Sequence, residues 1–478
     1  MPIIAGQLAR IVGRWHPRHV RGHATQKRLT GPLVIGVDSG TQSTKACVYD
    51  RHGQLVAAAS IPQPVSTPRD GFAEQDIGEW RRGVFEAIQQ AADAIPGDRD
   101  SVSIVGIGLA FQRESFALVA PQAEDYCPDA ALEPLCPAIL WLDGRAASEV
   151  AAIGEEQKGQ QLPPTAAGGS PATTSADGDR LCAAKYHQIT GKPLDVTSAW
   201  ARMRWLSTHE PSLFKGPPPL WVDCGAVLSH ALTGRRATCV AGADTCGLVD
   251  LESRSWSAPI LAASGLSLAQ LPDLLEPGAL VGTITAAAAE SMGGAVAEGT
   301  PVLMAGGDGQ VFNAGLAVSD GVSDGVSDGA IRSDHLKPQE LMLTLGTSVV
   351  LSMAASSLVT DPAFRTLAPA QILSATVSNQ HDDQSQSPAA AASMGYTLES
   401  VVQSGTLILR WFADEFSLQA QSTSSGGGDG GGDAMGEGFA ALDTAASLLP
   451  TGAEGLVTVP HWWGCRFPDS RPTIKGGA

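Results

Sequence analysis

The chain has 478 residues, more than a single hydrophobic core usually contains, so two domains with a cleft between them are expected. Apolar residues make up 43% of the chain and charged residues 17%. No apolar run approaches the roughly 20 residues of a membrane-spanning helix, which argues against a membrane protein. The net charge of -18, from 49 acidic and 31 basic side chains, argues against nucleic acid and anionic membranes as partners.

Cysteine usage indicates the redox environment. The 8 cysteines are scattered along the chain, with no CxxC pair and no secretory signal ahead of them. Neither a disulfide framework nor a zinc site is therefore expected, and a reducing, cytoplasmic setting fits best.

The N-terminus differs in composition from the rest of the chain. Residues 1–37 contain no Asp or Glu, while arginines and lysines recur from Arg10 to Arg28. Organelle presequences are rich in Arg and poor in acids, so a targeting leader is one interpretation. A disordered tail and a start codon assigned too early are the others. We predict that residues 1–31 form a basic, disordered extension.

The next segment has the pattern of an antiparallel meander. Residues 33–37 are apolar, a polar turn containing glycine follows at 38–44, and residues 45–50 return to a strand pattern. A second turn leads into a third strand at 55–60. Downstream, residues 79–95 have helical periodicity, and residues 102–109 form an apolar run typical of a buried strand.

Strands that alternate with helices predict an α/β domain. Three stretches, 155–180, 376–392 and 422–433, are rich in small and polar residues and are predicted to be solvated loops. A Ser-Asp-Gly repeat begins at Ser319, and we interpret residues 319–338 as a low-complexity linker between lobes rather than as a calcium site.

The first turn carries groups suited to a phosphate. Asp38 ends a strand and can hold hydrated magnesium. The turn that follows combines a glycine with hydroxyls and backbone N–H groups that can face a phosphate. Ordinary hairpin chemistry is the alternative interpretation. The residues predicted to contact phosphates here are Gly40, Thr41, Gln42, Ser43 and Lys45.

A similar strand, Gly-Thr hairpin and strand recur about three hundred residues later. The turn contains Gly346, Thr347 and Ser348, between apolar runs at 341–345 and 349–353. Two such hairpins, one in each lobe, are what a duplicated phosphate clamp would look like. No GxxxxGK[ST] sequence occurs, so a phosphate site here is not a P-loop.

Two further segments place polar residues at strand ends. Asp308 follows an apolar strand and could accept the proton of a hydroxyl during phosphoryl transfer, or simply bond its own turn. Gln112, Arg113 and Glu114 follow the buried strand at 102–109 and could line a polar pocket or form a surface ion pair.

Taken in order, these segments resemble the FGGY family of carbohydrate kinases. The resemblance extends from residue 32 to about 470. Its further landmarks are Gly71 to Asp76 with Trp80, Ala138 to Ala146, and Arg202 to Pro211, where Arg202 stands in place of the usual Lys.

The resemblance implies two actin-like lobes with ribonuclease H-like α/β cores and a nucleotide cleft between them. The sugar-binding N-terminal lobe would span 32–318 and a partial ATP-binding lobe 339–478. Asp308 would be the general base, and Asp38 would hold Mg²⁺. Gln112, Arg113, Glu114, Asp308 and Gln310 would bind the substrate, and the two hairpins would bind the phosphates of ATP.

The choice of substrate is less clear from the sequence. Gln112 to Glu114 looks like the glycerol kinase pocket, whereas Gly71 to Asp76, 137–146 and 185–191 look like xylulose kinases. Gly309 follows Asp308 where Asn or Gln is usual. We predict phosphorylation of a ketose such as D-xylulose, with glycerol or another polyol as the alternative. The oligomeric state stays open, with a homodimer as one option.

The chain stops at Ala478, before the family's glycine-rich adenine-binding turn. We therefore expect an incomplete second lobe. This keeps a third reading open, in which the protein is a truncated relic that binds sugar without phosphorylating it. A chaperone-like or actin-like ATPase would use the same hairpins but would have no sugar pocket.

Overall fold

The computed structural model describes residues 29–98, 101–121, 130–158, 181–322, 341–345, 348–370, 395–402, 405, 446–450 and 455. The predicted loop at 376–392, the predicted loop at 422–433 and nearly all of the predicted N-terminal extension lie outside the described residues. The same is true of Gly346, Thr347 and residues 323–338, and of residues 159–180 of the predicted loop at 155–180. Residues 155–158 of that predicted loop are instead the last turn of a helix, so this part of the prediction was wrong.

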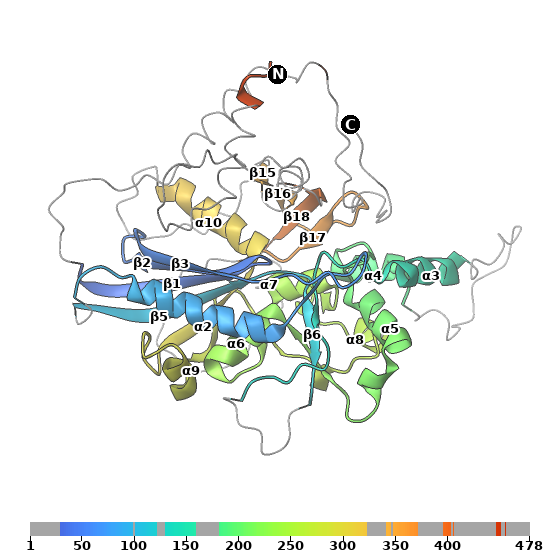
Figure 1. Cartoon of the computed structure of the whole chain (residues 1–478). Helices are drawn as coiled ribbons and strands as arrows, with labels where there is room; N and C mark the ends of the chain where they lie inside the picture. The colour runs from blue at the N-terminus through green and yellow to red at the C-terminus, as the bar shows by residue number, and fades with distance from the viewer. Residues whose placement is uncertain are drawn as a thin grey trace, which may run out of the picture.

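The main sheet contains six strands in the order β13-β14-β5-β1-β2-β3 (Figure 1). β1 pairs in parallel with β5, which pairs in parallel with β14, and the other pairings are antiparallel. The predicted meander is thus confirmed. Its strands and those beside them are β1 (Gly31–Ser39), β2 (Ser43–Asp50), β3 (Leu55–Pro62), β5 (Val102–Phe111), β13 (Leu280–Thr283) and β14 (Pro301–Gly307).

Helices α2 (Ile77–Asp93) and α6 (Cys224–Thr233) cover one face of this sheet. α2 begins after Asp76, whose side chain caps the helix by accepting a hydrogen bond from the backbone N–H of Gly78. The helix starts and ends two residues earlier than the predicted range 79–95. α6 ends at Gly234, which adopts the left-handed conformation that glycine tolerates best.

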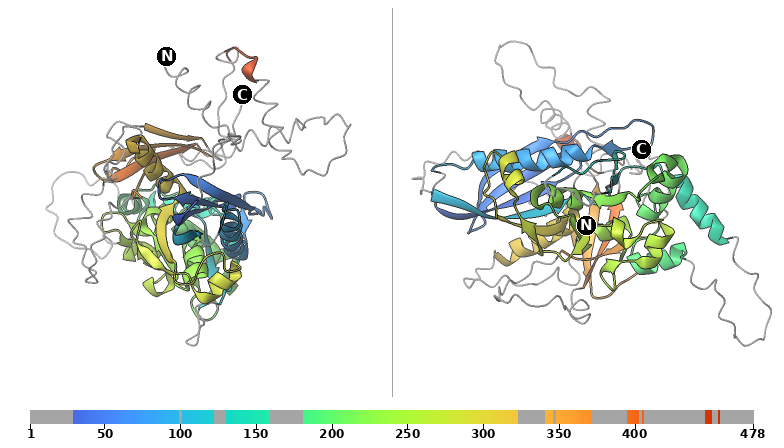
Figure 2. Two further views of the ribbon diagram at one scale, coloured as in Figure 1. Left: turned by 90° about the vertical axis from the view of Figure 1, so that its left-hand side faces the viewer. Right: turned by 90° about the horizontal axis from the view of Figure 1, so that it is seen from below.

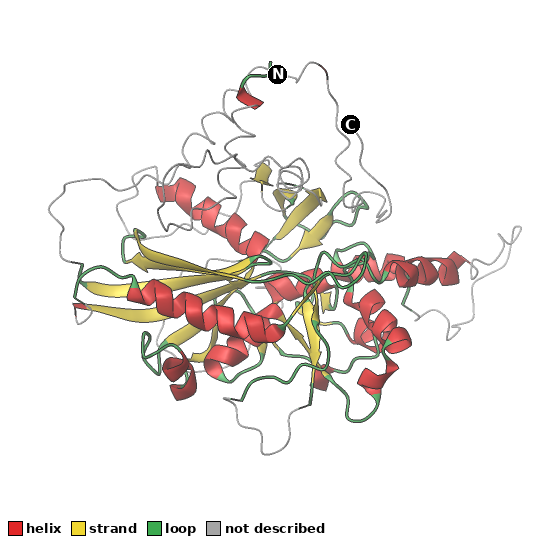
Figure 3. Cartoon of the chain, in the orientation of Figure 1, coloured by secondary structure: helices red, strands yellow, loops and turns green. Residues whose placement is uncertain are grey.

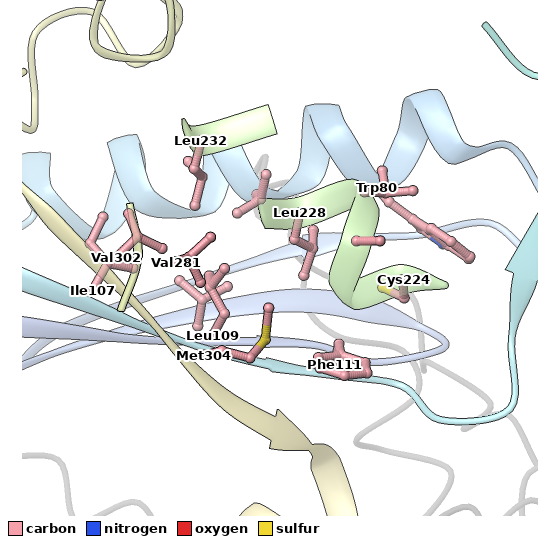
Figure 4. Close-up of a cluster of buried hydrophobic side chains, with 14 of the residues drawn as sticks. Trp80, Ile107, Leu109, Phe111, Cys224, Leu228, Leu232, Val281, Val302 and Met304 are labelled. Atoms are coloured by element: carbon pink, nitrogen blue, oxygen red, sulfur yellow. The ribbon is translucent and has the colours of Figure 1, made fainter. Parts of the chain in front are cut away.

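The core lies between these helices and the sheet. Alternate residues of β1 point into it, and Leu33 is one of them. Figure 4 shows Trp80 of α2 and Leu228 of α6 above Leu109 and Met304 of the central strands. Each fully buried aliphatic side chain contributes about 1.5–3 kcal/mol relative to an exposed one. The packed core therefore stabilises the sheet that carries the residues at the strand ends.

A second layer of structure continues from one end of the main sheet. It contains a four-stranded sheet in the order β4-β7-β6-β8 and a second hydrophobic cluster around Trp205 and Trp221. Its elements are β4 (Glu74–Gln75), β6 (Phe116–Val119), β7 (Ala138–Ile139), β8 (Leu220–Asp223), α3 (Ala147–Lys158), α4 (Ala183–Thr190), α5 (Ala199–His209) and α8 (Ala258–Ala263). The remaining short elements are β9 (Ala237–Cys239), β10 (Val249–Asp250), β11 (Ser255–Trp256), β12 (Asp273–Leu275), α7 (Val240–Ala243) and α9 (Ala286–Ser291). Of these, β9, α7 and α9 pack against α6 or β14 and belong to the core of the main sheet.

Helix α10 (Asp308–Val322) and a further sheet lie on the opposite face of the main sheet from α2 and α6 (Figures 2 and 3). α10 continues through residues 319–322, which the sequence assigned to the linker. The further sheet has the order β15-β16-β18-β17 and is called the distal sheet below. Its strands are β15 (Leu341–Leu345), β16 (Val349–Ala355), β17 (Arg365–Leu367) and β18 (Tyr396–Val402). Within the described part of the chain, no helix is both long and apolar enough to cross a membrane.

Candidate active site

A cleft of about 920 Å³ is lined by residues of the main sheet, α10 and the distal sheet. It brings together most of the side chains that the sequence singled out. The predicted residues that line it are Asp38, Gly40, Thr41, Gln42, Ser43, Lys45, Arg113, Glu114, Asp308 and Ser348. Gln112 and Gln310 do not line it, and Gly346 and Thr347 lie outside the described residues.

Asp38 lies near the end of β1, opposite Lys45 across the hairpin. Its Oδ1 atom is buried and has no hydrogen-bond partner. Burial, and then the nearby negative charge of Asp308, raise the pKa of Asp38 to about 6, against a smaller opposing effect of Lys45. An unpaired buried carboxylate oxygen in a cleft is suited to receive a cation.

The turn between β1 and β2 is held by its own backbone and by residues from other segments. Gly40 donates its N–H to the carbonyl of Ser43 at 3.0 Å. The Thr41 hydroxyl accepts a hydrogen bond from the indole N–H of Trp141 at 2.7 Å, and the Thr41 carbonyl accepts one from Gln75 at 2.7 Å. The Thr41 side chain is therefore already engaged within the protein.

Asp308 is the first residue of α10, directly after the buried strand β14. Its Oδ1 atom accepts hydrogen bonds from the backbone N–H of Gly309 at 2.8 Å and from Nε of Arg113 at 3.0 Å. The side chain is nevertheless 46% exposed. Both expectations for Asp308 therefore describe part of its geometry. One oxygen bonds the backbone of its own turn, and the carboxylate as a whole stays open to the cleft.

Arg113 lies against two glycines at the start of α10. A Cβ atom at Gly307 would lie 2.6 Å from Cγ of Arg113, and one at Gly309 would lie 2.5 Å from its Nη2. The arginine side chain thus occupies space that any other residue at 307 or 309 would need. Neighbouring carboxylates, with Glu399 having the largest effect, raise the pKa of Arg113 against the cost of its burial.

Gln112 and Gln310 are buried and bonded within the protein. Gln112 donates to Gln75 at 3.0 Å and accepts from the Ser115 hydroxyl at 3.2 Å. Gln310 donates to Oδ1 of Asp244 at 3.1 Å. The structure therefore places these two amides behind the cleft, where they support its walls.

Glu114 is buried between two cations. Its Oε1 accepts from Lys192 and from Arg365 of β17, both at 2.7 Å. Its backbone has φ 59, a conformation that non-glycine residues adopt rarely. Such strain persists where surrounding contacts enforce it, and the two cations are contacts of that kind.

Three functional candidates were not identified from the sequence. Arg365 and Glu399 come from the distal sheet, and Lys192 lies after α4. Together with Arg113 and Glu114 they form a buried network of charges. Their partners are up to 286 positions away in the chain, so no local pattern marks them.

A profile of the FGGY family of carbohydrate kinases, N-terminal domain, matches residues 33–176 and 178–315. This is more than half of the chain. The protein belongs to the FGGY family of carbohydrate kinases. A member of this family is a phosphotransferase. The match also confirms the resemblance to this family that the order of motifs in the sequence indicated.

Several curated relatives have assigned activities. Xylulose kinase of Escherichia coli (strain K12) is 26% identical over 445 residues, which cover 93% of this chain and 72% of the relative. Xylulose kinase of Klebsiella pneumoniae is 27% identical over 331 residues, covering 69% of this chain and 56% of the relative. Glycerol kinase of Alkalilimnicola ehrlichii is 29% identical over 289 residues, covering 58% of this chain and 49% of the relative.

Solved structures confirm the fold. Ligand-bound xylulose kinase from Lactobacillus acidophilus has a TM-score of 0.65 at 20% identity, covering 93% of this chain and 72% of the other. Plasmodium falciparum glycerol kinase with ADP has a TM-score of 0.63 at 17% identity, covering 94% and 73%. The predicted actin-like, ribonuclease H-like α/β class is therefore correct.

Proposed function

We propose that this FGGY member transfers the γ-phosphoryl group of ATP to a hydroxyl of a neutral polyhydroxy substrate, a ketose such as D-xylulose. The observation that carries the proposal is the placement of Asp308. It is a half-exposed carboxylate at a strand end, anchored through one oxygen by Arg113, in the same cleft as Asp38 and the first hairpin.

Asp308 would act as the general base. The substrate hydroxyl oxygen attacks the γ-phosphorus, its proton passes to the Asp308 carboxylate, and the bond between the γ-phosphorus and the bridging oxygen breaks to release ADP. Arg113 holds one carboxylate oxygen at 3.0 Å, which leaves the other to meet the hydroxyl. General bases of this kind contribute about 10²- to 10⁴-fold to the rate.

Asp38 would hold Mg²⁺. Its buried, unpaired Oδ1 atom fits a cation, and the described residues contain no cluster of three metal-ligating side chains. This combination suits magnesium, which is commonly bound by one or two carboxylates together with water and substrate phosphates. When bound, the ion would neutralise charge on the phosphates.

The first hairpin would contact the phosphates through Gly40, Gln42, Ser43 and Lys45, with the backbone of Thr41. Ser348 lines the same cleft from the distal sheet, where β15 and β16 form the second hairpin. Gly346 and Thr347 complete this part of the proposal from the sequence alone.

A ketose is favoured because xylulose kinases are among the relatives that align over most of this chain. Glycerol or another polyol is the second candidate. It is favoured by the Gln112 to Glu114 segment, because Arg113 and Glu114 both line the cleft that contains Asp308. Arg113 would contact substrate hydroxyls directly. Glu114, whose carboxylate is held by Lys192 and Arg365, would support the wall of the pocket, as would the amides Gln112 and Gln310.

The test is ADP release from Mg²⁺-ATP by the purified chain with xylulose, ribulose, glycerol and related polyols. Release stimulated by one compound, and lost in Asp308→Asn, is the expected result. A folded sample that binds a sugar without stimulated release would instead support the relic. Release that is indifferent to every sugar would indicate an ATPase.

A further inference from the structure

We propose that Glu399 of β18 is a positioning residue, which fixes Arg113 and through it the orientation of the Asp308 carboxylate. The inference rests on the proposed function, since it gives the distal sheet a part in aligning that base. Glu399 does not line the cleft, so it would act through Arg113 and not by touching the substrate.

Glu399 is bonded on both carboxylate oxygens. Oε2 accepts from Nη1 of Arg113 at 3.0 Å, and Oε1 accepts from Nε of Arg365 at 2.8 Å. Its side chain has no exposed surface. Burying a carboxylate is costly unless it is paired, and here two guanidiniums share one carboxylate. A small rotation of Glu399 would break at least one of these bonds, so its position is tightly fixed.

Arg113 transmits this constraint to the base. The guanidinium is planar and rigid, so holding Nη1 on Glu399 also sets the direction of Nε, which donates to Oδ1 of Asp308. The guanidinium also lies against Gly309, where a Cβ atom would be only 2.5 Å from Nη2 of Arg113. Glu399 and Gly309 therefore both confine Arg113.

A second contact strengthens the link between the two sheets. Arg365, which holds Glu399, also donates to Glu114, the residue after Arg113. Arg113 and Glu114, which follow β5 and Gln112 in the chain, are thus each attached to the distal sheet by an ion pair. Seating of the distal sheet and alignment of Asp308 would then be one event, and the base would be correctly oriented only when this sheet is in place.

A merely structural role for Glu399 makes a different prediction. Buried ion pairs often contribute to the fold without aiding chemistry. In that case Glu399→Gln would lower stability, but each folded molecule would keep its kcat and its KM for sugar. A positioning role predicts that Glu399→Gln changes kcat and the KM or affinity for sugar, while the KM for ATP stays close to that of wild type.

The experiment compares Glu399→Gln with Ser400→Ala and Gly309→Ala in the full chain. Ser400 is the next residue on β18, and its hydroxyl bonds the carbonyl of Ala363 on an exposed side, so it controls for disturbing the strand. Gly309→Ala changes no charge, and alanine is compatible with a helix, but its Cβ atom would displace the guanidinium of Arg113. kcat and both KM values would be measured with the responsive sugar, and sugar affinity without ATP would be followed by tryptophan fluorescence, since Trp141 lines the cleft.

We expect Glu399→Gln and Gly309→Ala each to lower kcat roughly 10- to 100-fold and to change the KM or affinity for sugar, with the KM for ATP within about twofold of wild type. Ser400→Ala should match wild type. If Glu399→Gln does not fold, Gly309→Ala decides. Wild-type kcat and sugar affinity in a folded Gly309→Ala or Glu399→Gln protein would overturn the positioning role alone. A wild-type chain that neither binds nor phosphorylates any sugar would overturn the proposed function and this inference with it.

Discussion

Two groups of polar side chains surround the cleft, and they differ in how fully their bonding capacity is used. Gln112, Gln310 and Glu114 are buried and bonded to protein partners on several atoms. Asp38 and Asp308 each keep capacity in reserve, through an unpaired buried oxygen in one and a half-exposed carboxylate in the other. All five were candidates from the sequence, but only Asp38 and Asp308 keep bonding capacity that a ligand could use.

This difference helps to distinguish residues that support such a site from residues that bind a ligand or take part in the reaction. A buried polar group costs about 1–3 kcal/mol when it is left without a partner. A protein that leaves Asp38 in that condition gains nothing for its fold, so the unmet bond points to a ligand. The bonded group, in contrast, should affect stability more than turnover. Each prediction below tests one side of this division.

Asp308→Asn should have the largest effect. The amide can still accept from Arg113 and Gly309 but cannot take up a proton, so kcat should fall about 10³-fold or more with little change in the unfolding free energy. Sugar-dependent ADP release and urea unfolding of the same samples measure the two effects. Asp273→Asn, at a side chain 60% exposed, is the matched control and should leave both unchanged. Substantial activity in Asp308→Asn would assign the base elsewhere.

Glu114→Gln should show the opposite pattern. The change removes a buried charge and leaves Lys192 and Arg365 facing a neutral amide, which should cost about 3–5 kcal/mol of unfolding free energy. Glu79→Gln, which weakens an exposed pair with Arg82, should cost less than about 1 kcal/mol. Urea unfolding measures both. A Glu114 variant as stable as wild type but unable to bind sugar would move Glu114 into the ligand-binding group.

The sequence predicted that Asp38 and Asp308 face a common cleft, because the position of each depends on a local rule. A polar residue at the end of an apolar strand can face a cleft, and this holds for Asp38 in β1 and for Asp308 directly after β14. The same rule could not show that Gln112 is bonded within the protein whereas Asp308 is open to the cleft. Whether the hydrogen-bonding atoms of a side chain already have partners depends on which residues lie near it in space. Gln75 and Asp244, which occupy these amides, are distant in sequence from them.

The fold was predicted best where periodicity is strong. The alternation in β1 to β3 and the helical spacing of α2 fixed these elements to within a few residues. The network through Arg365 and Glu399 was not predicted, because two antiparallel strands bring these residues to Arg113 and Glu114 from far along the chain. Pairing of charges over such separations leaves no trace in local composition.

The pH dependence of stability tests Glu399, a further buried residue whose two carboxylate oxygens are both bonded. Burial alone would raise the pKa of Glu399, but Arg113 and Arg365 overcome it and lower the pKa to about 2. A carboxylate with a lowered pKa stabilises the fold above its unfolded value of 4.5, and this stabilisation is lost as the pH falls toward 2. The shift corresponds to roughly 3 kcal/mol. The difference in unfolding free energy between wild type and Glu399→Gln should therefore shrink between pH 5 and about pH 2, as followed by urea unfolding. A constant difference over this range would contradict the assignment.

Thr41 has features of both groups, because it lines the cleft and its hydroxyl is already bonded within the protein. Trp141→Phe therefore tests whether a bonded side chain in the cleft acts only as scaffold. Thr41 lies in the hairpin expected to contact phosphates, yet its hydroxyl already accepts from the Trp141 indole at 2.7 Å. Phenylalanine keeps a smaller aromatic ring in the cleft wall and removes that donor, so the unfolding free energy should fall by about 1 kcal/mol from the lost hydrogen bond. The KM for ATP should change less than threefold, because the backbone of the turn, and not the Thr41 hydroxyl, would bind the phosphates. An increase of tenfold or more would show that Trp141 orients Thr41 for the nucleotide, and a side chain with every bond satisfied would then no longer be a reliable sign of a scaffold role.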